Sequence, residues 1–230
     1  MKERSRLRIL GIDTSSKFLS IALGRDDDII MEENYLLDRQ HSSLLVPKID
    51  ELLKKSGLSI KAVDAFIVGL GPGSFTGLRI GVSTVKGFGI ACGKPCIGVP
   101  SIDALAFNAP ADAEFIVPVI DAKRGQVYSA MYKKERGRVI KKAGYFLMPI
   151  TGFMKKVRYP AVFLGDALGL YSREIKDLNK ESVFLKEENW YPRAGNLIKL
   201  GIKNIKKSGK IGLNKLKPIY LYPKDCQVKK

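Results

Sequence analysis

The first third of the chain alternates between short apolar segments and polar turns. Residues 7–12 form an apolar segment that ends in a polar turn at 13–16, and residues 19–23 and 29–37 follow with alternating apolar and polar positions. Such segments predict strands, and short turns between them predict antiparallel neighbours. We therefore expect a three-stranded meander at the start.

A helix, a buried strand and a second helix are expected next. Leucines and isoleucines at helical spacing predict a helix from Ser42 to Lys55. The continuous apolar run at 63–70 predicts a strand buried on both faces, and a glycine-rich loop then leads into a helix that ends near Cys92. This order of elements predicts an α/β lobe.

The same pattern begins again in the second half of the chain. Ile120 and Asp121 close an apolar segment before a turn, as Ile12 and Asp13 do 108 residues earlier. A duplicated architecture is one interpretation, and chance identity over so few positions is the other. The lobes that we expect are an N-terminal lobe over 1–110 and a smaller basic lobe over 111–230. The elements expected beyond Lys133 are strands at 145–150 and 161–164, helices at 168–178 and 195–207, and a closing segment at 216–222.

The composition is that of an ordinary globular protein. Of the 230 residues, 45% are hydrophobic and 27% are charged, which excludes a disordered chain and a fibrous repeat. No stretch reaches the roughly 18 consecutive apolar residues that a membrane span needs, so no membrane partner is expected. The three scattered cysteines form no disulfide framework, which predicts a reducing compartment and the cytoplasm.

The net charge of +17 arises entirely in the second half. Residues 1–115 contain 14 Lys and Arg against 14 Asp and Glu, whereas residues 116–230 contain 26 against 9. A lysine-rich surface attracts polyanions such as RNA, but it is also common as a solvated face, and both interpretations stay open. If this surface binds RNA, the positions that would face it are Lys133, Lys134, Lys141 and Lys142.

A carboxylate at the end of the first strand is the first candidate for chemistry. Asp13 followed by Thr14 and Ser15 can orient Mg²⁺ and a phosphate. The alternative is an Asx turn between two strands, which the spacing favours. Asp121 holds the corresponding position in the second half.

The segment GPGSFTGLRIG at 71–81 is the second candidate. It is not a P-loop, because no GK[ST] follows. Gly77, Gly81 and Gly89, with Val85 between them, form a stripe of small residues on one helix face, which another backbone can approach closely. That backbone is either the protein's own core or a helix of another chain.

Metal-dependent and triad-type hydrolysis have little support. His41 is the only histidine, so a paired-histidine zinc site cannot form. No nucleophile elbow accompanies it. We expect no catalytic residue, no metal and no intrinsic cofactor.

Six segments together resemble the bacterial TsaB family, also called YeaZ, of tRNA threonylcarbamoyladenosine biosynthesis proteins. The resemblance covers nearly the whole chain and implies an α/β duplicated actin-like, Hsp70-like ATPase (RNase H-like) fold with a reduced second lobe. The segments are ILGIDTS at 9–15, Arg39 to Ser42, GLGPGSFTGLRIGV at 69–82, IGVPSIDALA at 97–106, VIDAKRGQVY at 119–128 and PIYLYPK at 218–224.

The resemblance also implies a non-catalytic role. It identifies the chain as a paralogue of TsaD, the subunit that transfers threonylcarbamoyl to N6 of adenosine 37 in tRNA. In this family the protein binds TsaD through the two helices of its first lobe, a TsaE ATPase joins the complex, and the isolated protein can form a homodimer. ATP or ADP and Mg²⁺ then enter only with the complex. The residues expected at the partner are Leu45, Ile49, Leu52, Gly77, Gly81, Val85 and Gly89.

The second half departs from a working kinase of this superfamily. Asp121 is followed by Ala-Lys-Arg, and only the segment 165–169 is similar to an adenosine-binding segment. ATP turnover by the chain alone is therefore not expected. The alternative is a stand-alone ATP-dependent phosphotransferase or acyltransferase, which needs Asp13 and Asp121 in one cleft. A free-standing RNA-binding protein is a weaker alternative, because no known RNA-binding module is present.

Overall fold

The computed structural model describes residues 6–37, 41–208 and 213–222. The chain divides into two compact units. The first unit contains residues 1–104 and 192–219, and the second contains residues 105–191 and 220–230.

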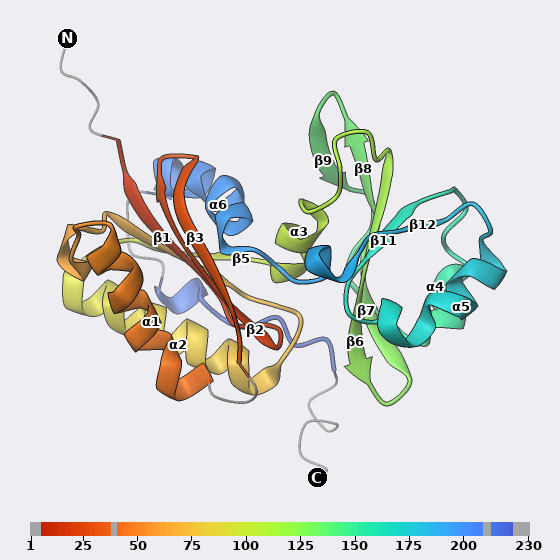
Figure 1. Cartoon of the computed structure of the whole chain (residues 1–230), viewed down its shortest axis with the longest axis horizontal. Coiled ribbons are helices and arrows are strands. Elements are labelled where there is room, and N and C mark those ends of the chain that lie inside the picture. Colours follow the sequence, from red (N-terminus) through yellow and green to blue (C-terminus); the bar gives the residue numbers. More distant parts are fainter. Residues whose placement is uncertain (1–5, 38–40, 209–212, 223–230) are drawn as a thin grey trace. The chain divides into compact units, whose positions relative to one another are not determined.

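The first unit is built on a five-stranded sheet with the strand order β3-β2-β1-β4-β5 (Figure 1). The meander β1 (Arg8–Asp13), β2 (Phe18–Arg25) and β3 (Asp28–Leu36) pairs antiparallel, whereas β4 (Ala65–Gly69) and β5 (Cys96–Val99) extend the sheet in parallel with β1. The predicted meander and the predicted buried strand are confirmed.

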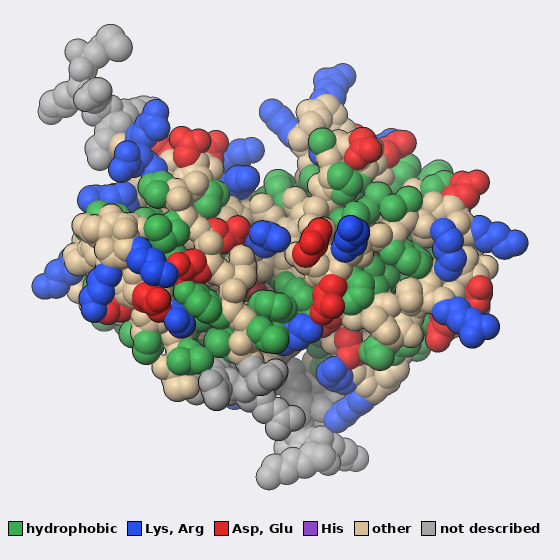
Figure 2. All heavy atoms as spheres, in the orientation of Figure 1, with side chains coloured by type: hydrophobic (Ala, Val, Ile, Leu, Met, Phe, Trp, Pro, Cys, Tyr) green, Lys and Arg blue, Asp and Glu red, His purple; other side chains and the backbone are tan. Residues whose placement is uncertain are grey.

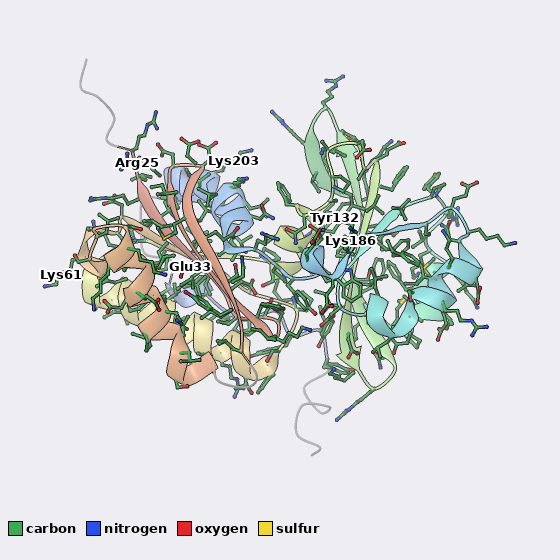
Figure 3. The ribbon with its side chains drawn as sticks, viewed as in Figure 1. Arg25, Glu33, Lys61, Tyr132, Lys186 and Lys203 are labelled. Atoms are coloured by element: carbon green, nitrogen blue, oxygen red, sulfur yellow. The ribbon has the colours of Figure 1, made fainter. Side chains whose placement is uncertain are left out.

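The two predicted helices are confirmed, and both cover one face of this sheet (Figure 1). α1 (His41–Lys55) and α2 (Phe75–Cys92) pack their apolar residues into one core with Leu10 and Ile12 of β1. The C-terminal end of α1 is tied to β3 by an ion pair of 2.8 Å between Lys55 Nζ and Glu33 Oε1, and Figure 3 shows Glu33 on that strand. The hydrogen bond from Lys55 lowers the pKa of Glu33.

The other face of the first sheet is covered by α6 (Ala194–Ser208), with α3 (Ser101–Ala106) following β5. The backbone N–H of Ala194 donates to Ser20 Oγ at 2.8 Å, and that of Gly195 donates to Glu32 Oε1 at 2.7 Å. The first N–H groups of a helix lack partners within it and favour a negative charge, so side chains of β2 and β3 hold the start of α6.

The compact units differ from the predicted division at residue 110. The prediction assigns 192–219 to the second lobe, whereas these residues belong to the first unit. The reason is the apolar face of α6: Leu197, Ile198 and Ile202 are buried with Ile9 of β1. The order of elements in the chain does not show which sheet a terminal helix will cover.

The second sheet repeats the topology of the first. Its main path is β10-β7-β6-β11-β12, with antiparallel pairs from β10 to β6 and parallel pairs from β6 to β12. β6 therefore takes the place of β1, and the predicted duplication is confirmed. The strands are β6 (Phe115–Lys123), β7 (Gln126–Ser129), β10 (Phe146–Met148), β11 (Val162–Leu164) and β12 (Val183–Phe184).

The helices of the second unit are short, and a hairpin is added to its sheet. The predicted strand at 145–150 is only partly right, because α4 already begins at Ile150, and the predicted closing segment at 216–222 forms neither a strand nor a helix. The remaining elements are α4 (Ile150–Met154), α5 (Leu168–Leu178), the hairpin β8 (Tyr132–Glu135) and β9 (Arg138–Lys141), and the 3₁₀ turns η1 (Ile60–Ala62), η2 (Glu187–Asn189) and η3 (Leu213–Lys215).

Three glycines of α2 allow the helix to pack closely against the turn after β1 and against β5. A Cβ at Gly77 or Gly81 would collide with Thr14 in the turn after β1, and a Cβ at Gly89 would collide with Cys96 Sγ in β5. Gly87, in the same helix, is exposed, and a Cβ there would meet nothing within 4 Å. The two kinds of glycine form a matched pair for substitution.

We predict opposite effects of alanine at Gly81 and at Gly87. Gly81→Ala forces Thr14 to move and should lower the free energy of unfolding by about 1–3 kcal/mol. Gly87→Ala adds a good helix former in open space and should raise it by about 0.5–1 kcal/mol. Urea unfolding of both variants measures the difference. Equal effects of the two substitutions would contradict the close packing of α2 on the turn after β1.

Candidate functional site

The turn after β1 has the geometry of an Asx turn. Asp13, Thr14 and Ser15 are all buried. Asp13 Oδ1 accepts hydrogen bonds from Ser15 N at 2.8 Å and from Ser15 Oγ at 2.6 Å. Thr14 Oγ1 donates to the carbonyl oxygen of Gly77 at 2.7 Å. A carboxylate that accepts the N–H two residues ahead defines an Asx turn, so this part of the candidate phosphate site has a structural role.

The same turn packs against the glycine-rich loop and the segment after β5. Ser74 N donates to the carbonyl oxygen of Ser15 at 2.7 Å, and Gly71 N donates to Ser101 Oγ at 3.0 Å. A Cβ at Gly69, the last residue of β4, would collide with Asp13 and Ser101. The carboxyl ends of parallel strands are where α/β proteins usually bind phosphates. In this protein the backbone N–H groups of Ser74 and Gly71 instead donate to groups of the same unit.

Asp121 repeats this arrangement at the end of the corresponding strand, β6. Its Oδ1 accepts from Lys123 N at 2.8 Å, and its Oδ2 forms an ion pair of 2.5 Å with Lys123 Nζ. Its backbone N–H donates to Asp166 Oδ1 at 2.9 Å. The hydrogen bond to Asp121 raises the pKa of Lys123, so the lysine stays protonated and balances the carboxylate. The structure thus gives both candidate aspartates the same local role, each in its own unit.

No arrangement typical of a metal centre is present in the described ranges. Nowhere in residues 6–37, 41–208 and 213–222 do three His, Cys, Asp or Glu side chains gather closely enough to hold an ion. Cys92 and Cys96 are free thiols, and burial raises the pKa of Cys96 to about 11, which keeps it protonated at neutral pH. The helices in the described ranges are too short or too polar to span a membrane.

The residues expected at a partner lie on the inner faces of their helices, which corrects that expectation. The side chains of Leu45, Ile49 and Leu52 are at most 2% exposed, and Val85 is fully buried. Gly77, Gly81 and Gly89 are buried against this chain's own turn and β5. A stripe of apolar or small residues predicts a contact, but it does not show which surface makes that contact. Here both stripes pack against their own unit.

The outward side of the same two helices exposes apolar side chains among polar ones. Val46 of α1 is 48% exposed, and Phe75 and Ile90 of α2 are 38% and 70% exposed. The exposed residues of α2 between them include Ser83 and Gly87, which are small. Hydrophobic side chains are visible over this side of the first unit in Figure 2. We call Val46, Phe75, Ser83, Gly87 and Ile90 the outer helix face. On α2, these residues lie roughly half a turn from the buried stripe, and that spacing is the signal that could have found them.

The four lysines predicted to face tRNA lie on or next to the hairpin of β8 and β9, and three of them have partners. Lys133 Nζ lies 3.4 Å from Glu114 Oε1, and Lys142 Nζ lies 2.5 Å from Glu135 Oε1. Lys141 Nζ donates to the hydroxyl of Tyr145 at 2.5 Å and lies 3.9 Å from the centre of its ring. Lys134 is half-buried, and its backbone N–H donates to the carbonyl oxygen of Glu114 at 2.8 Å.

Comparison with known proteins identifies the family of the chain. The model of the family "TsaD: tRNA N6-adenosine threonylcarbamoyltransferase" matches residues 35–166. The tRNA threonylcarbamoyladenosine biosynthesis protein TsaB of Bacillus subtilis is 33% identical over 85% of this chain and 87% of its own length.

Solved structures agree with this result. YeaZ from Pseudomonas aeruginosa superposes with a TM-score of 0.77 at 26% identity, over 94% of this chain and all of that chain. The activator of 2-hydroxyisocaproyl-CoA dehydratase from Clostridium difficile, solved with bound ADPNP, has a TM-score of 0.53 at 10% identity, over 93% of this chain and all of that one, and shares the fold alone. The predicted actin-like ATPase fold is confirmed, and the chain belongs to the TsaB family.

Proposed function

We propose that this protein acts in the synthesis of threonylcarbamoyladenosine in tRNA, as an accessory subunit that binds a TsaD-like catalytic paralogue. The names of its relatives and the matching family model support the pathway. The observation that carries the accessory role is the outer helix face, which leaves Val46 and Ile90 in solvent although the unit has a complete core beneath them.

The outer helix face suits contact with two helices of another subunit. Exposed apolar side chains on adjacent helices contribute binding energy when they are buried, and the small Ser83 and Gly87 allow a close helix crossing. In the absence of the paralogue, a second copy of this chain can occupy the same face as a homodimer. A TsaE-like ATPase would join this complex, and ATP or ADP and Mg²⁺ would enter with it.

The two aspartate turns support a non-catalytic role. A stand-alone phosphotransferase needs carboxylates that can hold a metal and its waters. In each unit, however, Oδ1 of the aspartate accepts the N–H two residues ahead, and Asp121 is also paired with Lys123. The rival function would require both turns to open.

We predict that a charge on the outer helix face abolishes binding of the paralogue. Ile90→Asp should remove the partner from affinity purification of the tagged chain without unfolding it, because Ile90 is 70% exposed and touches little of its own core. Leu170→Asp is the matched control, since Leu170 is 64% exposed on α5 of the second unit. Retained binding in Ile90→Asp, or equal loss in both variants, would place the partner elsewhere.

We predict that Asp13 supports stability rather than turnover. Asp13→Ala removes the acceptor of Ser15 N and Ser15 Oγ, so the free energy of unfolding should fall by about 1–3 kcal/mol. Formation of the modified nucleoside by the reconstituted complex should be unchanged at a temperature where the variant is folded. Loss of modification by a folded variant would support the stand-alone enzyme instead.

A further inference from the structure

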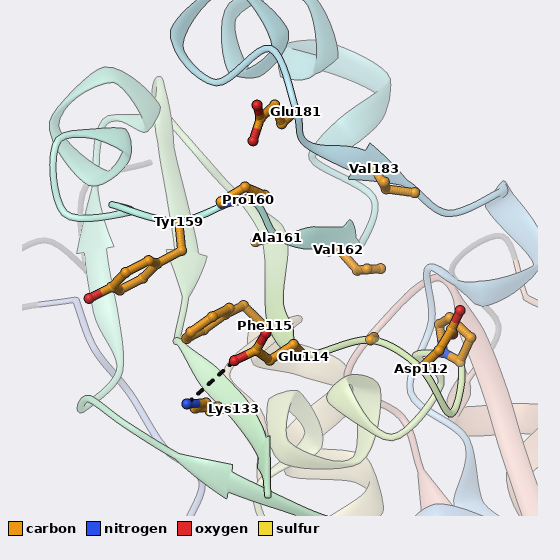
Figure 4. Close-up of a pocket in the computed structure, with 12 residues that line it drawn as sticks. Asp112, Glu114, Phe115, Lys133, Tyr159, Pro160, Ala161, Val162, Glu181 and Val183 are labelled. Carbon is orange, nitrogen blue, oxygen red and sulfur yellow. Dashed lines mark ion pairs between the residues drawn. The ribbon is translucent and has the colours of Figure 1, made fainter.

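A groove of about 730 Å³ opens in the second unit at the amino ends of its parallel strands (Figure 4). Phe115, Val162 and Val183, the first residues of β6, β11 and β12, all line it. Asp121 lies toward the opposite end of β6, so the groove is separate from the strand end where actin-like proteins are expected to hold phosphate. Its volume falls in the range of small-ligand sites.

One wall of the groove is a pair of stacked aromatic rings. The rings of Tyr159 and Phe115 lie 4.7 Å apart between centroids and only 9° from parallel. Lys133 Nζ lies 5.3 Å from the centre of the Phe115 ring. Tyr159 is nevertheless 57% exposed, so the stack still presents aromatic surface to solvent. Exposed rings held in this way are the platforms on which proteins stack unpaired bases.

The groove and the hollow beside it are lined by charges of both signs. Glu114 and Lys133 form an ion pair of 3.4 Å, drawn as a dashed line in Figure 4, and both residues also line a neighbouring hollow on the hairpin. The carboxylates of Asp112 and Glu181 line the groove at separate positions (Figure 4). The hollow on the hairpin is lined by the cations Lys134, Arg136 and Arg138, and by Glu135, which is paired with Lys142.

The two carboxylates Asp112 and Glu181 and the three cations of the hollow are available to a ligand. Within the part of the chain that the structure describes, neither the two carboxylates nor the three cations form an ion pair or a side-chain hydrogen bond. Figure 2 shows Lys and Arg side chains at the tip of the hairpin. A matching ligand therefore carries a flat ring, negative charge toward the hairpin, and hydrogen-bond donors that reach a carboxylate of the groove.

We infer that this groove binds unpaired nucleotides of single-stranded RNA. The base of one nucleotide packs against Tyr159 and Phe115, phosphates of the strand lie near Lys134, Arg136 and Arg138, and bases along the groove present their N–H groups to the carboxylate of Asp112 or of Glu181. The choice of RNA over DNA rests on the proposed function. A cationic peptide would suit the carboxylates, but the three hairpin cations would repel its continuation.

The carboxylates make the site selective between bases of the same size. Cytosine offers an N4 amino group that donates to a carboxylate, whereas uracil has an O4 acceptor at that position. The full-length chain alone should therefore bind a labelled hexamer of cytidylate more tightly than a hexamer of uridylate. Asp112→Ala with Glu181→Ala should remove this preference, and equal affinity of the unsubstituted chain for the two hexamers would overturn the inference.

Stacking and phosphate contact are tested separately by fluorescence anisotropy with the cytidylate hexamer. Tyr159→Ala should weaken binding by about five-fold or more. Tyr220→Ala, at a tyrosine that is 39% exposed and does not line the groove, should leave it unchanged. Equal affinity of the Tyr159→Ala and unsubstituted chains would overturn the inference.

The contribution of the hairpin cations to RNA affinity is tested against a control pair of lysines in the first unit. Arg136→Glu with Arg138→Glu should lower affinity by about ten-fold or more and flatten its dependence on salt. Lys199→Glu with Lys203→Glu changes the net charge equally on α6, where Figure 3 shows Lys203, and should have a small effect. Equal losses would mean diffuse attraction by net charge. Tighter binding of an oligolysine peptide, lost in Asp112→Ala with Glu181→Ala, would assign the groove to a cationic partner. Both results would overturn the inference but leave the binding of the paralogue by the outer helix face untouched.

Discussion

The close contact between the turn after β1 and the start of α2 is the constraint on which the first unit depends. Thr14 Oγ1 donates to the Gly77 carbonyl oxygen, and the lack of a side chain at Gly77 and Gly81 lets the helix approach the turn. Because Ser74 N also donates to the carbonyl oxygen of Ser15, the turn, the glycine-rich loop and the helix form one packed assembly. The position of α2, and with it the outer helix face, follows from this contact.

The same contact occupies the strand end at which α/β proteins often bind phosphate. In a phosphotransferase, the strand-end aspartate and the loop facing it must leave room for a phosphate and a metal. In this protein the N–H and hydroxyl of Ser15 and the hydroxyl of Thr14 bond within the unit. A unit that keeps the architecture but fills the strand end with its own groups is suited to presenting a surface, which agrees with the accessory role proposed above.

The sequence predicted the topology well, but it did not predict which surface each apolar helix face contacts. The spacing of apolar segments was sufficient for β1 to β4, α1 and α2, and the repeated Ile-Asp pair at 12–13 and 120–121 indicated the duplication that the strand orders confirm. Periodicity shows that a helix has an apolar face, but the contacting surface depends on long-range packing. For that reason α6 was assigned to the wrong unit, and the buried residues Leu45 and Val85 were expected at a partner. The groove beside Tyr159 could not be predicted, because its residues come from four separate segments of the chain.

The distribution of charge in the second unit shows why a net charge alone is a poor guide to a binding site. The excess of +17 predicts attraction to any polyanion, yet Lys133 and Lys142 are paired with carboxylates and Lys141 contacts Tyr145. Of the cations without such partners, Lys134, Arg136 and Arg138 line the hollow beside the groove that also contains Asp112 and Glu181. Carboxylates next to a phosphate-binding surface reduce nonspecific affinity, and in exchange they can distinguish bases by their donors. Diffuse charge can therefore bring RNA to this unit, while the few uncommitted groups around Tyr159 determine which nucleotide remains bound.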